Sequence, residues 1–111
     1  MKLPKTMTAR GRTYKCKYSE FPVDDHGEIS AGICDTELKE LEIQIGLKPE
    51  QTLEVFIHEW LHAIWEELGL DNEKLPKILE HVLVCAISKD MVINRKELIF
   101  MLRQLPHSQK T

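Results

Sequence analysis

The spacing between apolar residues changes near residue 46, and this change most constrains the fold. Before it, Leu41, Ile43 and Ile45 alternate with polar neighbours, a pattern typical of a half-buried strand. After it, apolar residues recur every three or four positions, as on one face of a helix. This second set is Leu53, Phe56, Ile57, Trp60, Leu61, Ile64 and Leu68. We therefore expect an α+β chain, with strands over about residues 5–46 and helices after them.

The strand half also predicts how its strands pair. Lys5–Ala9 and Thr13–Tyr18 flank the turn dipeptide Arg10-Gly11, which favours a hairpin. Short connections between strands are typical of antiparallel pairing. We expect a small antiparallel sheet of three or four strands, packed on its covered face against the helices.

Three helices are expected in the second half, over about residues 49–69, 76–90 and 95–105. Pro49 suits a first helical turn and Gly69 a helix stop. Asn94 and Glu97 have the spacing of a capping box at the start of the third helix. The second helix is expected to bury an apolar set, namely Ile78, Leu79, Val82, Leu83 and Ala86. With 111 residues, the chain 1–111 is expected to form a single domain.

Composition excludes several classes of protein. Apolar residues make up 42% of the chain and charged residues 30%, which is typical of a soluble globular protein. The polar start predicts no secretory signal, and no apolar run reaches the roughly 18 residues of a membrane span. Three isolated cysteines, Cys16, Cys34 and Cys85, indicate free thiols in a reducing compartment. We expect a cytoplasmic protein without a membrane partner.

The charge of the chain is uneven along its length. Residues 1–17 hold six Lys or Arg and no acid, whereas the remainder holds nine basic residues against eighteen acidic ones. Such an arm could contact nucleic acid, but no interleaved aromatic residues or reading motif accompany it. A solvated basic face is the expected interpretation, and a nucleic-acid accessory protein is kept as an alternative function.

The segment His58-Glu59-Trp60-Leu61-His62 carries the sharpest chemical signal. Residues four apart lie above one another on a helix, so His58 and His62 can share one metal ion. Zinc suits a site of nitrogen and oxygen ligands that leaves a corner for water. Glu59 lies a fraction of a turn away, where it can act as the general base without being a ligand.

A catalytic zinc site needs a third protein ligand, and the second helix offers two neighbouring candidates. Glu80 and His81 both lie about one turn into that helix. The apolar residues around them do not separate the two positions. The spacing alone therefore leaves both Glu80 and His81 open.

The order of strands, HExxH helix and a further helix bearing a carboxylate resembles the gluzincins. More narrowly, it is similar to the small ImmA/IrrE-like, minigluzincin-type metallopeptidases of phage and prophage genomes. The matching segments, which span most of residues 5–90, are Gly11–Tyr14, Gly32–Asp35, Leu41–Ile45, His58–Ile64 and Ile78–Val82. This resemblance implies a zincin-like fold and Glu80 as the third ligand, with His81 as a departure beside it. A phage-encoded copy would work in the cytoplasm of its host bacterium.

The expected function is a zinc metalloendopeptidase that hydrolyses peptide bonds with metal-activated water. By resemblance, its partner is a protein or peptide substrate, such as a regulator, laid along an edge strand within Gly27–Cys34. The chain's oxyanion donor is left open among Tyr14, Tyr18, His26 and His81. A second hypothesis is a zinc-containing protein-binding module without catalysis, in which His81 or His107 closes the coordination. The sequence does not predict an oligomeric state.

Overall fold

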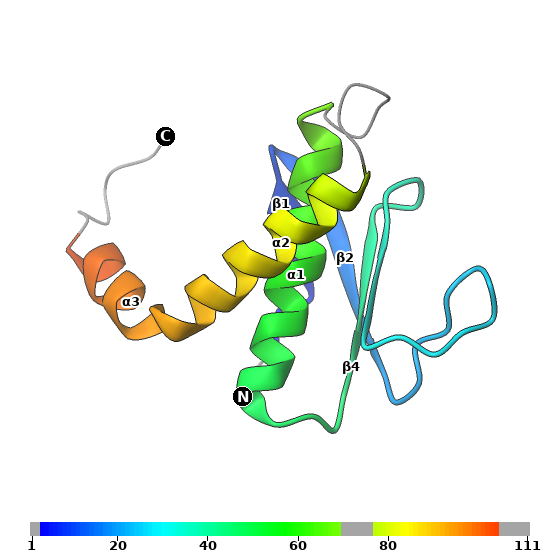
Figure 1. Cartoon of the computed structure of the whole chain (residues 1–111), viewed down its shortest axis with the longest axis horizontal. Coiled ribbons are helices and arrows are strands. Elements are labelled where there is room, and N and C mark those ends of the chain that lie inside the picture. The colour runs from blue at the N-terminus through cyan, green and yellow to red at the C-terminus, as the bar shows by residue number, and fades with distance from the viewer. Residues whose placement is uncertain (1–2, 70–76, 105–111) are drawn as a thin grey trace.

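The computed structural model describes residues 3–69 and 77–104, which form a four-stranded sheet and three helices (Figure 1). The strands are β1 (Thr6–Ala9), β2 (Arg12–Ser19), β3 (Gly32–Asp35) and β4 (Glu40–Gln44). The helices are α1 (Pro49–Glu67), α2 (Lys77–Ile93) and α3 (Arg95–Arg103). The predicted α+β class and the order of strands before helices are confirmed.

The sheet is mixed, so the predicted all-antiparallel sheet is wrong. Its strand order is β1-β2-β4-β3, and β2 pairs with β4 in parallel. Residues 20–31 connect β2 to the far edge of the sheet and leave space for one strand beside β2. There β3 forms, and the turn at Thr36–Lys39 returns the chain into the empty position as β4. The connection between β2 and β3 is longer than a hairpin turn, and this length produces the parallel pair.

The β1–β2 hairpin forms where the sequence predicts it. Both turn residues have positive φ, 53° at Arg10 and 84° at Gly11, as a two-residue turn between twisted antiparallel strands requires. In β4 the side chains of Leu41 and Ile43 are fully buried, as their alternation with polar residues predicts.

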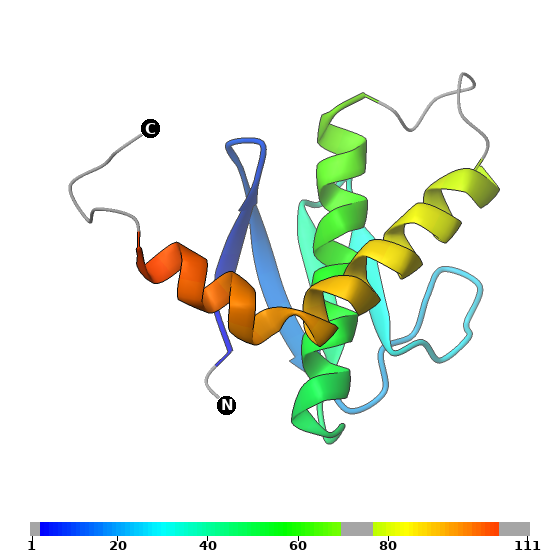
Figure 2. The ribbon, with the colours of Figure 1, turned by 60° about the vertical axis from the view of Figure 1, so that its left-hand side comes forward.

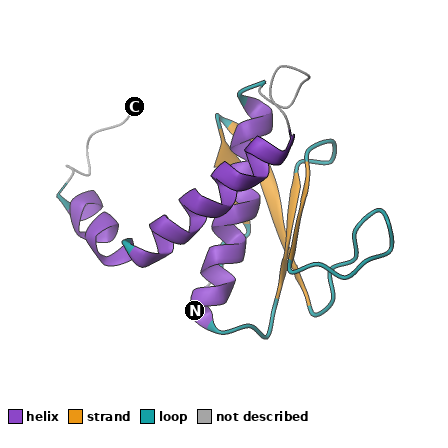
Figure 3. Ribbon diagram, in the orientation of Figure 1, coloured by secondary structure: helices purple, strands orange, loops and turns teal. Residues whose placement is uncertain are grey.

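The layers stack in the order sheet, α1, α2 (Figure 2). Helix α1 lies against one face of the sheet, and α2 crosses over the face of α1 that is turned away from the strands (Figure 3). Phe56 and Ala63 of α1 join Tyr14, Leu41 and Ile43 of the sheet in one buried cluster. The main core therefore lies between the sheet and α1.

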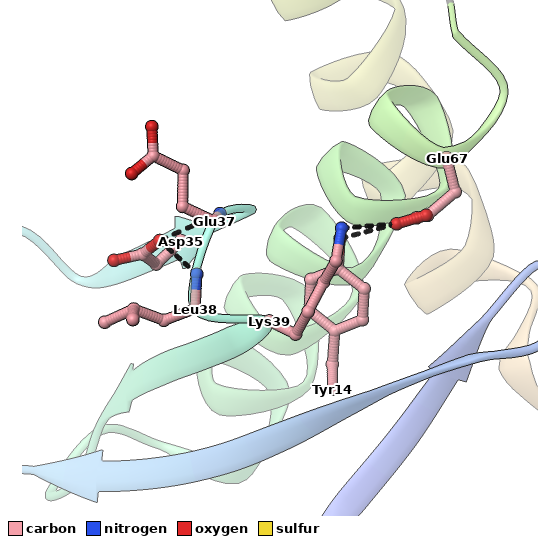
Figure 4. A network of polar contacts seen from close by, with 6 residues as sticks. All are labelled: Tyr14, Asp35, Glu37, Leu38, Lys39 and Glu67. Carbon is pink, nitrogen blue, oxygen red and sulfur yellow. Dashed lines mark hydrogen bonds and ion pairs between the residues drawn. The ribbon is translucent and has the colours of Figure 1, made fainter.

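A polar network fixes the C-terminal end of α1 to the sheet (Figure 4). The Lys39 ammonium lies 2.6 Å from a Glu67 carboxylate oxygen, which also accepts a 3.4 Å hydrogen bond from the buried Tyr14 hydroxyl. Asp35 accepts backbone hydrogen bonds from Glu37 and Leu38 and so shapes the turn that holds Lys39. The network sets the height at which α1 lies on the strands.

Helix α2 buries a different face from the one that the sequence predicts. The buried residues of α2 are Val84, Ser88 and Val92, whereas Ile78 is 75% and Val82 56% exposed. All five residues expected in the core are exposed on α2, because the helix meets α1 with its other face. The prediction of a capping box at the start of α3 is also wrong. The Asn94 side chain makes no capping hydrogen bond to α3, and its amide donates instead to the carbonyl of Asp90.

Within residues 3–69 and 77–104, no helix combines the length and the apolar character needed to cross a lipid bilayer.

Candidate metal centre

Helix α1 turns the three polar residues of its HExxH segment toward two different layers. The buried positions of α1 are Thr52, Phe56, Glu59 and Ala63, which recur every three or four residues and face the sheet. His58 and His62 lie beside this stripe, on the side that meets α2. The segment therefore lies between the sheet and the outer helix.

The two histidines approach each other closely. Their Nε2 atoms are 3.2 Å apart, and the rings meet edge to face. A tetrahedral ion with metal–nitrogen bonds of 2.0–2.1 Å holds its nitrogen ligands about 3.3 Å apart. The pair therefore has the separation that one bound zinc ion needs.

His58 is kept in the form that binds metals. Burial, together with the nearby rings of His62 and His81, lowers the pKa of His58 from 6.5 to about 4. The imidazole is therefore neutral at neutral pH, with a lone pair available to an ion.

Glu80 of α2 lies against the same pair. One of its carboxylate oxygens is 2.6 Å from Nδ1 of His62, on the other side of the ring from His58. In this arrangement the carboxylate accepts a hydrogen bond from Nδ1–H, which leaves Nε2 free to bind an ion, as carboxylates beside metal-bound histidines do. The structure thus brings Glu80 to the pair, while its direct coordination of the ion stays a prediction.

His81, the alternative ligand, is exposed on α2, with its ring centroid 5.9 Å from that of His58. Between them lies Cys85, whose Sγ is 3.9 Å from Nδ1 of His58 and 3.6 Å from Nε2 of His81. The sequence interpretation missed Cys85. Its signal was the four-residue spacing from His81, which repeats the spacing of His58 and His62.

Glu59 occupies a confined and poorly solvated position. It is 8% exposed, and burial raises the pKa of its carboxyl from 4.5 to about 7. It lies against Gly32 of the sheet, where an added Cβ would lie 2.8 Å from Cγ and Oε2 of Glu59 and 2.7 Å from Cγ1 of Val55. The carboxylate can approach the strand only because residue 32 has no side chain.

Two cavities meet at Glu59. One of about 520 Å³ is lined by Gly32, Cys34, Glu59, His62, Glu80 and His81, among others. The other, of about 420 Å³, extends toward the start of α1 and shares Gly32 and Glu59 with the first. Together they form a groove that runs along β3 and is open to both histidines.

Strand β3 is an edge of the sheet and overlaps the predicted edge segment Gly27–Cys34 at residues 32–34. Gln44 N–H donates to the Ala31 carbonyl, so the alternation of an antiparallel pair turns the backbone groups of Gly32 and Cys34 away from β4. The Gly32 carbonyl already accepts a hydrogen bond from Ser30 Oγ. The Gly32 and Cys34 N–H groups and the Cys34 carbonyl therefore face the groove side of the strand.

The four residues predicted as possible donors to the oxyanion lie in different parts of the structure. Tyr14 is fully buried and its hydroxyl binds Glu67, while the Tyr18 hydroxyl donates to the carbonyl of Pro4. Both therefore serve the packing of the sheet. His26 lies in the exposed turn at residues 24–27, and His81 lines the same cavity as Glu59 and His62. His107 lies outside the described residues.

Comparisons with protein-family models, with curated proteins and with solved structures find no match to this chain.

Proposed function

We propose that this chain is a zinc-dependent metallopeptidase with a zincin-like arrangement, resembling the small ImmA/IrrE-like gluzincins. The observation that carries the proposal is the 3.2 Å separation of the His58 and His62 Nε2 atoms, with the Glu59 carboxylate one residue away on the same helix. Paired imidazoles and a buried acid beside a groove are the parts that metal-assisted hydrolysis requires.

Zinc is the ion that the donor set fits best. The imidazole nitrogens have its ligand spacing, and the Glu80 carboxylate, which lies at Nδ1 of His62, holds that ring in the ligating orientation. To become the third ligand, as the resemblance implies, the carboxylate would have to move from Nδ1 to the ion. When bound, zinc would polarise a peptide carbonyl and bring the pKa of a water molecule down toward about 7.

Glu59 is proposed to move the proton. Its carboxylate accepts a proton from the attacking water and then delivers it to the nitrogen of the departing amine. A pKa near neutrality suits a group that must both accept and donate within one turnover. Of the oxyanion candidates, His81 is favoured because it lines the cavity that holds Glu59.

The substrate is proposed to be a protein or peptide bound in an extended conformation along β3. The backbone groups of Gly32 and Cys34 would form the hydrogen bonds of an added strand. That strand would lie in the groove, with a peptide bond passing near Glu59 and the two histidines. A bacterial or phage regulator in the cytoplasm is the class of substrate that the resemblance favours.

The proposal is tested with Glu59→Gln. The amide keeps the size of the side chain but accepts no proton, so we expect unchanged zinc content and a fall in peptide cleavage of at least about 10²-fold. Zinc is measured by elemental analysis, and cleavage by mass spectrometry of a peptide library.

Glu50→Gln is the matched control, because Glu50 lies on the same helix with its side chain 68% exposed and paired with Arg95. It should cleave like the parent. Equal turnover in Glu59→Gln and the parent would remove Glu59 from the mechanism.

A second candidate function is a zinc-containing module that binds proteins without cleaving them. It is favoured by the group His58, His81 and Cys85, whose donor atoms lie within 4.8 Å of one another and would hold an ion at Nδ1 of His58, outside the position between His58 and His62. A chain that binds zinc, binds peptides and cleaves none of them in either the parent or Glu59→Gln form would support this alternative. Nucleic-acid binding through residues 1–17 remains a prediction, tested by its dependence on salt.

A further inference from the structure

A second group of metal donors lies beside the histidine pair. It consists of His58 of α1 together with His81 and Cys85 of α2, one turn apart on the outer helix. Their potential ligand atoms all lie within 4.8 Å of one another. Cys85 is the central member, with its Sγ 3.9 Å from Nδ1 of His58 and 3.6 Å from Nε2 of His81.

These separations fit a bound ion. With metal–sulfur bonds of 2.3 Å and metal–nitrogen bonds of 2.0–2.1 Å, a tetrahedral ion separates sulfur from nitrogen by about 3.6 Å. One of the observed distances equals this value and the other is slightly longer. The ligand nitrogens of His58 and His81 lie within 4.8 Å of each other, and the two side chains would close to about 3.3 Å around an ion.

The group differs from the histidine pair in the nitrogen that it uses. Nε2 of His58 faces His62, whereas Nδ1 faces Cys85. The two nitrogens of one imidazole point away from each other, so an ion at Cys85 cannot occupy the position between His58 and His62. The ligand chemistry also differs, because a thiolate selects softer metals than a set of imidazole and carboxylate does.

We propose that His58, His81 and Cys85 form a second metal site, which takes a soft or borderline divalent cation such as zinc or cadmium. The site binds its ion whether or not the chain is a peptidase. Under the proposed function, one consequence follows: an ion held there occupies His81, which lines the cavity beside Glu59, and excess metal inhibits cleavage.

Cobalt binding tests the site directly. Co²⁺ is titrated into the metal-free full-length chain, and the near-ultraviolet charge-transfer band of a cobalt–thiolate bond is recorded. We expect the band in the parent and its loss in Cys85→Ser. Cys34→Ser is the matched control, because Cys34 lines the adjoining cavity but belongs to neither donor group, and it should keep the band.

Three further variants separate this site from the histidine pair. His62→Ala removes a ligand of the pair only and should keep the band, whereas His81→Ala should weaken the cobalt affinity at Cys85 by at least about tenfold. Glu59→Gln should keep the band even where it abolishes cleavage. A parent with the band but without peptidase activity would contradict the proposed function alone.

The second site is overturned if the parent shows no band, if the band survives in Cys85→Ser, or if His62→Ala loses it as His81→Ala does. A further measurement uses the unmutated chain, so its result does not depend on whether a variant folds. Bound Cd²⁺ should slow the alkylation of Cys85 by iodoacetamide by about tenfold or more, because the metal-bound thiolate is not available to the reagent. Alkylation of Cys85 at an unchanged rate would contradict the site.

Discussion

At the scale of single residues, the proposed general base Glu59 carries a cost in stability. Its carboxyl is enclosed between α1 and Gly32, and burial raises its pKa to about 7. The folded metal-free chain therefore holds this proton more tightly than the unfolded chain does. Because the folded pKa is raised, the associated stability is fully present below about pH 4.5 and is lost as the pH rises through 7.

Replacing Glu59 by Gln should remove this pH dependence in the metal-free chain. Between pH 5 and pH 8, the free energy of unfolding of the parent should fall by about 2 kcal/mol more than that of Glu59→Gln. Urea denaturation in the presence of a chelator, at both pH values, measures the difference. Curves for parent and variant that shift equally with pH would show that Glu59 ionises normally in the folded state.

Gly32→Ala should displace Glu59 without removing it. The added Cβ would lie within 2.8 Å of Val55 and Glu59 side-chain atoms, which must move. Since a small misplacement of a catalytic group can cost about 10²-fold, we expect kcat to fall by about 10- to 100-fold with zinc content unchanged. A kcat equal to that of the parent would show that the position of Glu59 does not depend on this contact.

The residues of the site were predicted to different extents. The four-residue spacing of His58 and His62 fixes their common direction on any helix, so the pair could be predicted before its surroundings were known. Cys85 is a free thiol, as predicted, but its place beside His58 was not predicted. The spacing of His81 and Cys85 puts both on one face of α2 but does not say which face meets α1. Pairing across two helices is a property of packing, which a single segment does not encode.

At the scale of elements, α2 is the least enclosed part of the site. It meets α1 through Val84, Ser88 and Val92, while the apolar face that includes Ile78 and Val82 is exposed. Helix α3 buries no side chain among its described residues. The position of Glu80, His81 and Cys85 therefore depends mainly on the contact between α2 and α1.

Two valine variants measure this contact. Val84 is 2% exposed and Val82 is 56% exposed on the same helix. Val84→Ala leaves a gap between α1 and α2, so we expect a loss of about 2 kcal/mol in the free energy of unfolding and weaker zinc binding. Val82→Ala should change the free energy of unfolding by less than about 0.5 kcal/mol. The reverse order of the two effects would assign the opposite face of α2 to the interface.

The fold was predictable where local patterns decide it. The β1–β2 hairpin follows from its turn dipeptide, and the bounds of α1 follow from Pro49 and Gly69. The parallel pairing of β2 with β4 was not predictable from alternation, because a strand has the same period in either direction. The prediction of which face of α2 is buried was wrong. Apolar periodicity identifies a stripe of residues but not its partner, and on α2 this stripe faces solvent.

At the scale of the whole molecule, the three layers are joined by unequal means. A buried apolar cluster and the Tyr14–Lys39–Glu67 network join the sheet to α1. Helix α2 is joined to α1 by a few buried side chains and by the contacts of His58 and His62 with residues 80–85. A metal ion bound to donors from both helices would act as a cross-link between the second and third layers.

Zinc should therefore stabilise the chain. At a free zinc concentration of about 100 times the Kd of the His58–His62 site, we expect the free energy of unfolding to rise by about 2.7 kcal/mol from that site alone, and His62→Ala should lose this contribution. Chemical denaturation with zinc and with a chelator gives the two values. Superimposable curves would mean that the folded chain has no preference for the ion.

The exposed apolar face of α2 has a consequence for the life of the protein in a cell. If zinc holds α2 in place, as proposed, this helix, which presents isoleucine and valine to water, would become accessible to degradative enzymes when the ion is withdrawn. Under zinc starvation the steady-state amount of the polypeptide would then decline before its synthesis changes. The zinc supply would then set both the abundance of the protein and the fraction of its chains that hold an ion.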